Sequence, residues 1–452
     1  MSQETRTRLK QWLENGEARL QPLTLPQREL WEASPVPAGD AANHICALIN
    51  VRGPITQQGC EAAVQKVADR QEVFRLSFLP GKTQPMQLIR KTSRQTIKFR
   101  ELSSTQQQPE AIDEMAQEIF RRPFDMVGGP LYRYELLRCS ADDHVIVLAI
   151  HHAIADGWTV GVFVQDLFAA YMMDLRGIAG GLPPVPLSYS DWGAAERAFW
   201  QPAVLEQRSA FWKERLDKPT LLWNPPIGPA ALSGIRQRWV SSAPATVGRA
   251  VRELAKRHGA TLFSTLLAAF QITLSRLTGK DDILVGTPVA NRSKQAVRET
   301  MGYCSGIVPL RGHIDRDKTF SERLRAVHES TIDAFANAMP FAELVKALGV
   351  TTTPGCNPVF QVRFALQNHP VPDITVNGMS LNLQMRSTGT CRFDLACEVT
   401  EEGEALEVVW LFRPDQFAIE DIHNLHRMYL GVLTSVCGSP EILTAALMTT
   451  SL

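Results

Sequence analysis

Two adjacent histidines, His151 and His152, end a short apolar run at residues 145–150, Val-Ile-Val-Leu-Ala-Ile. A run of this length that is rich in β-branched residues predicts a buried strand. A neutral imidazole accepts a proton near pH 7, or holds a nucleophile by a hydrogen bond. Because no serine or cysteine lies in a recognisable nucleophile elbow, covalent acyl-enzyme chemistry has no obvious carrier. The pair therefore predicts a general base, or a positioning group, for a nucleophile that the substrate brings.

The two histidines are not expected to do the same work, because adjacent strand residues point to opposite faces of a sheet. The face of His151 carries the odd-numbered residues of the run, and the face of His152 carries the even-numbered ones. If strand geometry continues to residue 152, one histidine faces the site and the other faces the packing beneath it. The alternation alone does not choose between them.

Asp156 and Gly157 follow the pair and close its loop before a helical pattern begins. A carboxylate at position 156 can orient an imidazole, or it can pair with an arginine and lock the loop; we favour the second role. Gly157 fits a tight turn, where the missing Cβ allows close backbone approach. A metal site would need further ligands at fitting spacing, which no His-Glu-x-x-His run or cysteine cluster supplies. We expect no metal.

The composition excludes several classes of function. Positive and negative side chains balance at 47 each, so no charge excess points to nucleic acid or to a membrane surface. No apolar run reaches the roughly 18 residues of an ordinary membrane-spanning helix. The N-terminus lacks the apolar core of a secretory signal. Eight cysteines without a Cys-x-x-Cys pair predict reduced, mostly buried thiols in a cytoplasmic protein.

A chain of 452 residues is too long for one ordinary core, so two domains are expected. We predict a charged, solvated leader helix in residues 1–20, a first mixed α/β unit in residues 21–180 and a second in residues 181–452. The Gly- and Pro-rich residues 177–186 cannot continue a helix or a central strand, and they begin the crossover between the units.

Helical and strand patterns alternate in both units. A turn at residues 142–144 predicts that strand 132–138 pairs antiparallel with strand 145–150. Apolar residues with helical spacing predict a core helix over residues 160–172. Further helices are predicted at residues 55–67, 112–120, 247–258, 262–277, 320–338 and 419–433, and further strands at residues 44–51, 282–286, 359–366, 395–400 and 406–412.

The run His-His-x-x-x-Asp-Gly after an apolar strand resembles the signature of the condensation domains of nonribosomal peptide synthetases and of related acyltransferases. It does not stand alone, because other segments resemble further motifs of that family, in the family's order. These segments are residues 25–31, 70–78, 189–192, 286–292, 301–311, 339–343, 357–368 and 392–395. The resemblance therefore spans residues 22–440.

The resemblance implies two chloramphenicol-acetyltransferase-like halves arranged in a V, with the active site in a central tunnel. It places His152 at the reaction centre, with His151 as support. Asp156 would be a structural brace that pairs with an arginine, for which Arg75 is our candidate and Arg70 the alternative.

The resemblance also implies the reaction. An acyl or peptidyl group would pass from a phosphopantetheine thioester on a carrier protein to an amine or hydroxyl acceptor, giving an amide or ester in natural-product biosynthesis. His152 would take or position the acceptor's proton, and the backbone N–H of Gly157 would help to stabilise the oxyanion. The chain itself would bind no cofactor. No adenylation or carrier domain is recognisable, so we expect a free-standing monomer that meets its acyl or peptidyl carrier in trans, with a small-molecule or carrier-bound nucleophile.

The chain departs from the family pattern away from the histidine motif. The second motif, residues 70–78, has Gln71 where relatives usually have histidine. Residues 286–292 and 301–311 resemble the family's bridging segment between the two halves, and Gly306 takes its usual asparagine position. Asn357 follows Thr-Thr-Pro-Gly-Cys instead of the usual Arg-Asp-x-Ser-Arg. We place Gly306 and Asn357 at the tunnel or bridging segment, where acceptor recognition would be unusual.

Two alternative functions remain. Epimerase domains share the histidine motif, although they usually follow an attached carrier domain. A non-catalytic domain that only recruits carrier proteins is the other alternative. Degenerate members of that kind usually lose the catalytic histidine, so the intact motif argues against it.

Overall fold

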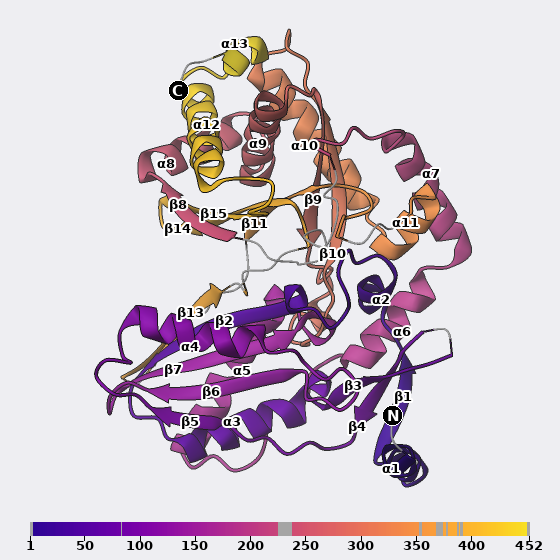
Figure 1. Ribbon diagram of the computed structural model, residues 1–452, viewed down its shortest axis with the longest axis vertical. Coiled ribbons are helices and arrows are strands. Elements are labelled where there is room, and N and C mark those ends of the chain that lie inside the picture. The colour runs from indigo at the N-terminus through magenta and orange to yellow at the C-terminus, as the bar shows by residue number, and fades with distance from the viewer. Residues whose placement is uncertain are drawn as a thin grey trace.

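The computed structural model describes residues 3–82, 84–224, 237–351, 355–367, 374–376, 378–386, 388 and 392–449. These residues form a mixed α/β protein with two halves, each built on a six-stranded sheet. The two halves lie one above the other in Figure 1, the N-terminal half in indigo to magenta and the second half largely in orange to yellow. The predicted mixed α/β class with two halves is confirmed.

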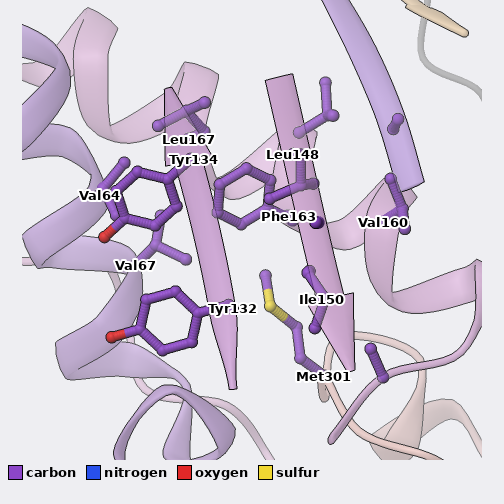
Figure 2. Packing of buried hydrophobic residues seen from close by; sticks show 14 of the residues in the cluster. Val64, Val67, Tyr132, Tyr134, Leu148, Ile150, Val160, Phe163, Leu167 and Met301 are labelled. Atoms are coloured by element: carbon purple, nitrogen blue, oxygen red, sulfur yellow. The ribbon is translucent and has the colours of Figure 1, made fainter. Parts of the chain in front are cut away.

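The sheet of the N-terminal half carries the histidine motif on its central strand β7 (Asp143–His151), in the order β12-β13-β2-β7-β6-β5. The antiparallel pairing of β7 with β6 (Tyr132–Arg138) confirms the predicted hairpin. Helices α3 and α5 cover one face, where Figure 2 shows Leu148 and Ile150 of β7 packed with Phe163 of α5. The other strands and helices of this region are β2 (His44–Arg52), β5 (Lys98–Glu101), α3 (Gln57–Arg70), α4 (Pro109–Arg121) and α5 (Gly157–Leu175).

Two strands of this sheet come from far along the chain. Strand β12 (Ile374–Val376) pairs with β13 (Met379–Arg386), and β13 runs antiparallel to β2. In Figure 1 the orange β13 lies beside the purple β2. The N-terminal core also takes up Met301, Tyr303 and Cys304 from the bridging segment. The boundaries at residues 20 and 180 stay predictions, but residues beyond 180 complete the first half's sheet and core.

The leader helix is not solvated as the sequence suggested. Helix α1 (Gln3–Glu14) is followed by β1 (Ala18–Pro22), which joins a three-stranded sheet in the order β1-β4-β3. Trp12 and its apolar neighbours on α1 pack against Ala18 and the apolar residues of that sheet. Strands β3 (Leu76–Leu79) and β4 (Met86–Arg90), the short 3-10 helix η2 (Glu72–Arg75) and α2 (Leu25–Glu32) complete this region.

The second half has a sheet in the order β10-β9-β11-β14-β15-β8. Buried aromatic rings of Phe270, Phe364, Trp410 and Tyr429 join its sheet to its helices. Strand β11 begins at Val362, not at residue 359 as predicted. The strands are β8 (Gln237–Ala243), β9 (Asp282–Val289), β10 (Gly306–His313), β11 (Val362–Gln367), β14 (Leu395–Glu402) and β15 (Ala405–Phe412); the helices are α6 (Tyr189–Phe199), α7 (Pro202–Arg215), α8 (Ala245–Arg257), α9 (Leu262–Thr278), α10 (Phe320–Ala336), α11 (Phe341–Leu348), α12 (Ile419–Gly438) and α13 (Thr444–Thr449).

Within the described ranges, no helix by itself is long and apolar enough to cross a membrane. Helices α8 and α9 reach that length and composition only as a pair, and the pair is bent by 108°.

Candidate active site

His151 is the last residue of β7 and lies fully buried. Because side chains alternate along a strand, it lies on the sheet face opposite to Leu148 and Ile150. Its Nε2–H donates to the Ala38 carbonyl at 2.8 Å, and its Nδ1 accepts from the Ala153 N–H at 3.0 Å. Both ring nitrogens are therefore used. Burial, with the charge of nearby His44 as a second cause, lowers the pKa of His151 to about 3. His151 is thus a neutral side chain that holds the loop.

His152 begins the 3-10 helix η3 (His152–Ile154), where the chain leaves strand geometry. Its ring is partly exposed, and the Tyr303 ring lies 4.3 Å from it between centroids. Nδ1 is buried against the backbone of its own loop and makes no regular hydrogen bond with the described residues. Nε2 is therefore the nitrogen that a substrate can reach. Burial, followed by the positive charge of Arg392, lowers the pKa of His152, against the opposing effect of Asp156.

Asp156 caps the N-terminus of α5 and is only 2% exposed. Its Oδ1 accepts from the Thr159 N–H at 3.0 Å and from the Thr159 hydroxyl at 2.9 Å. Its Oδ2 accepts from the N–H groups of Cys304 at 3.1 Å and Ser305 at 3.2 Å. Arg292 donates to both oxygens at 3.1 Å. Burial acts to raise the pKa of Asp156, but Arg292 and the other donors outweigh it, and the pKa lies below its usual value.

The arginine that pairs with Asp156 is therefore Arg292, and the prediction of Arg75 or Arg70 is wrong. Arg75 donates to the carbonyls of Ala68, Asp69 and Arg90, so it closes a turn of its own region. It supports the fold there and does not contact the loop.

Arg70 pairs with Asp166 and Glu299 instead of Asp156. The adjacent Gln71, which takes the usual histidine position, is 1% exposed and contacts the same region. Its amide donates to Asp166 at 3.0 Å and to the Glu299 carbonyl at 2.9 Å, and its oxygen accepts from the Met301 N–H at 3.0 Å. Gln71 thus holds the bridging segment against the N-terminal half.

Gly302, in the same segment, has a φ of +156°, and a Cβ there would lie 2.1 Å from the Tyr189 ring. Tyr189 accordingly packs flat against the bridging segment and donates to the Tyr303 carbonyl at 2.9 Å. The motif at residues 189–192 therefore acts as a support for the segment that carries Tyr303.

Gly157 is the first residue of α5. The first N–H groups of a helix have no acceptor within the helix, and they carry its partial positive charge. The backbone N–H of Gly157 is therefore a suitable donor to an oxyanion formed near His152. Its role stays a prediction.

Gly306 begins β10 opposite Val289. A Cβ at this position would lie 3.2 Å from the Asn291 side-chain nitrogen, so a larger residue requires Asn291 to move. Asn357 lies elsewhere in a local turn, where its side-chain oxygen accepts from the N–H groups of Val359 and Phe360. The structure does not bring Gly306 or Asn357 into contact with His152, and their link to a tunnel stays a prediction.

Three side chains near His152 were not expected from the sequence. Glu29 of α2 accepts from Arg392 at 3.1 Å, and Tyr303 forms hydrogen bonds to both. All three residues lie in segments that resemble family motifs, but the motifs do not say which of these side chains meet. Cys304, beside Asp156, is fully buried, and burial raises the pKa of its thiol far above the usual value. It is therefore no nucleophile.

Among the described residues, no three or more His, Cys, Asp or Glu side chains gather as they would around a metal ion. The chemistry available at this loop is that of one accessible neutral imidazole beside a helix N-terminus. A neutral imidazole and aligned N–H donors are the groups that acyl transfer between two substrates requires.

A two-half α/β fold with a braced His-His-x-x-x-Asp-Gly loop defines the class of protein. The Condensation domain family model matches residues 17–451, and the chain belongs to this family. It is similar to a linear gramicidin synthase of Brevibacillus parabrevis, at 30% identity over 94% of the chain and 8% of that protein. It is also similar to the phosphinothricin tripeptide synthetase PhsC of Streptomyces viridochromogenes, at 29% identity over 94% of the chain and 40% of that protein.

Solved structures show the same fold. The condensation domain of the monacolin K polyketide synthase MokA superimposes with a TM-score of 0.82 at 19% identity, over 94% of this chain and 99% of that one. The X-domain from teicoplanin biosynthesis gives a TM-score of 0.81 at 22% identity, over 94% and 96%. Condensation domains generally transfer acyl or peptidyl groups in nonribosomal peptide synthesis. The chain spans less than a tenth of the first curated relatives it matches.

Proposed function

We propose that this protein joins an acyl or peptidyl group, carried as a phosphopantetheine thioester on a separate carrier protein, to an amine or hydroxyl acceptor. The product is an amide or an ester. The observation that carries this proposal is His152, a partly exposed imidazole whose neutral form is favoured. Family membership supports acyl transfer in general.

In the proposed reaction the acceptor nitrogen or oxygen attacks the thioester carbonyl carbon. Nε2 of His152 accepts the proton that the acceptor loses, or holds the acceptor in line for attack. The Gly157 N–H at the start of α5 stabilises the oxyanion. When the C–S bond breaks, the sulfur leaves with the electron pair and takes up the proton. No covalent intermediate on the protein is needed, which agrees with the inert, buried thiol of Cys304.

We further propose that the two substrates reach His152 between the halves, along a tunnel. Support comes from the origin of the groups around the imidazole: His152 and Glu29 belong to the N-terminal half, whereas Tyr303 and Arg392 come from the bridging segment and the second half. The protein acts as a monomer that meets its carrier in trans.

Replacement of the imidazole tests the proposal. We expect His152→Gln to lower the single-turnover rate of transfer from an acyl-loaded carrier protein by roughly 10²–10⁴, the usual contribution of base catalysis. The control is His144→Gln, which changes a buried histidine at the far end of β7, the strand that leads to His152. A His152→Gln rate within a few-fold of the control's would disprove the base or positioning role.

Two further measurements distinguish acyl transfer from the alternative functions, epimerisation and carrier recruitment. An aminoacyl carrier protein incubated in deuterated water without an acceptor gains deuterium at Cα only if the protein epimerises. Carrier binding without turnover, on a panel of acyl groups and acceptors, would show a recruitment domain.

A further inference from the structure

A buried cluster of three side chains lies against the back of the His152 ring. The Tyr303 ring contacts the imidazole at 4.3 Å between centroids, with the two planes tilted by 59°. The Tyr303 phenol is hydrogen-bonded to Glu29 and to Arg392. Arg392 Nη1 in turn donates to Glu29 Oε1 at 3.1 Å. The three residues come from α2, from the bridging segment and from the residues just before β14, so the cluster forms only when the two halves are together.

The cluster differs from other ion pairs of the protein in two respects, its burial and its effect on His152. The Glu29 and Arg392 side chains are 8% and 15% exposed, so their charges are poorly screened by water. The charged groups that act on the pKa of His152 are Arg392, which lowers it, and Asp156, which raises it. Asp156 is already engaged by Arg292 and four further hydrogen bonds. Arg392 is therefore the cation that acts most strongly on the imidazole.

We propose that Arg392, fixed by Glu29 and Tyr303, is a positioning residue for His152 that keeps the imidazole unprotonated and its ring in place. This inference rests on the proposed function, since an unprotonated imidazole is what a base needs. Arg392 touches no reacting atom. It acts through its charge, and through the Tyr303 ring that it helps to hold.

Because the cluster contains residues of both halves, the His152 imidazole is kept unprotonated only when the two halves are together. If the halves separate, Arg392 moves away from His152 and the imidazole gains proton affinity. The neighbouring residue of α2 offers a comparison within the same interface: Arg28 pairs with Glu343 of α11 at 3.0 Å, also between the halves, but not beside His152. Two adjacent residues of α2 thus form ion pairs with different segments of the second half, and only one of these pairs is expected to affect the imidazole.

The direct test measures the protonation of His152 without any substrate. Protein labelled with ¹⁵N-histidine has 10 imidazoles, and the signal lost in His152→Gln assigns the residue. We expect the apparent pKa of His152 to rise by about one unit or more in Arg392→Gln, because a neighbouring cation shifts a pKa by roughly 1–3 units. The double variant Glu29→Gln/Arg392→Gln leaves no buried carboxylate unpaired, and it should show the same rise. Glu29→Gln keeps the cation, so the pKa should not rise.

The conservative variant and the matched control separate charge from structure. Arg392→Lys keeps the charge and should keep the low pKa of His152. Glu343→Gln breaks the adjacent ion pair, and should lower the melting temperature by a similar amount without moving the titration. An unchanged titration in both Arg392→Gln and the double variant overturns the inference.

The rate of acyl transfer gives the second measurement. The acid limb of the pH–rate profile should move upward in Arg392→Gln by the same shift as the titration, and should stay in place in Glu343→Gln. If the titration moves but no variant, nor the wild type, transfers any acyl group, the proposed function fails while the effect of Arg392 on His152 stands. If transfer occurs and neither profile moves, the positioning role is wrong.

Discussion

Two buried carboxylates near His152 pair with arginines from later in the chain, but their pKa values are shifted in opposite directions. Asp156 receives Arg292, two N–H groups of the bridging segment and two donors from Thr159. Glu29 receives Arg392 and Tyr303. Burial raises the pKa of Glu29 more than its two partners lower it, whereas the donors around Asp156 more than offset burial. The number of donors, not the presence of an arginine, decides which carboxylate is firmly ionised.

This difference gives the two ion pairs, Asp156–Arg292 and Glu29–Arg392, different roles. A carboxylate whose pKa is lowered is a weak proton acceptor, so the contacts of Asp156 fit a brace of the loop. The Glu29–Arg392 pair is less completely satisfied, and its arginine acts on the imidazole. The site therefore has one rigid ion pair that fixes the loop, and a weaker pair that we propose controls the protonation state of His152.

The largest expected effect follows from breaking the rigid pair. Asp156→Ala leaves Arg292 buried and unpaired, and removing one partner of a buried ion pair costs about 3–5 kcal/mol. We expect a loss of that size in urea unfolding, together with a lower transfer rate. The control is Asp333→Ala, which removes an exposed partner of Arg215 at 2.8 Å and should cost less than about 1 kcal/mol. Full stability with a lost rate would show that Asp156 is not a brace.

The free energy of unfolding lost in Asp156→Ala should become smaller only in acid. Because the folded pKa of Asp156 is lowered, its contribution is fully present above the unfolded pKa near 3.8, and it is lost as pH falls from there through the folded pKa. The stability gap between wild type and Asp156→Ala should therefore be constant from pH 5 to 8 and narrow only in stronger acid.

Much of this region could be predicted from the sequence, and the rest could not, for physical reasons. The strand before His151, its hairpin partner and the core helix over residues 160–172 follow from local periodicity, which the chain carries within a few residues. The partner of Asp156 lies 136 residues away, and that of Glu29 lies 363 residues away. No local pattern encodes such a distance, and the only argument for Arg75 is that it lies in a motif of the same half.

The assignment of distant segments to the two halves could not be predicted from local patterns either. The alternating strand pattern of residues 379–386 says nothing about which sheet it joins, and β13 adds to the sheet of the other half. The choice between His151 and His152 needed the family resemblance, and the structure supplies its physical reason. Both nitrogens of His151 are used by the Ala38 carbonyl and the Ala153 N–H.

A smaller effect is expected at the second pair. Glu29→Gln should cost about 1–2 kcal/mol near pH 4, because the amide does not reproduce the hydrogen bonds that the buried carboxyl makes with Arg392 and Tyr303. The raised pKa of Glu29 gives the opposite pH dependence: its contribution is present below the unfolded value of 4.5 and is lost as pH rises through the folded pKa. The difference in the free energy of unfolding between wild type and Glu29→Gln should thus become smaller as pH rises. A gap that instead narrows in acid, as for Asp156, would contradict the distinction between the two carboxylates. Glu32→Gln, at the exposed end of the same helix, is the control.

Glu196 of α6 is a third carboxyl for this comparison, and almost no hydrogen-bond donors surround it. Its Oε2 has no hydrogen-bond partner among the described residues, and burial raises its pKa to about 8, against the charge of Arg197 and a hydrogen bond with Trp200. A raised folded pKa means that stability is lost as pH rises from 4.5 toward 8. Glu196→Gln removes that loss, so we expect the variant to be more stable than wild type by up to roughly 4 kcal/mol at pH 8 and close to it near pH 5. Urea unfolding at both pH values measures this, with Glu206→Gln, an exposed residue of the neighbouring helix, as the control. A variant that is less stable than wild type at pH 8 would mean that Glu196 has an ionic partner, and that donor number does not order the three carboxyls.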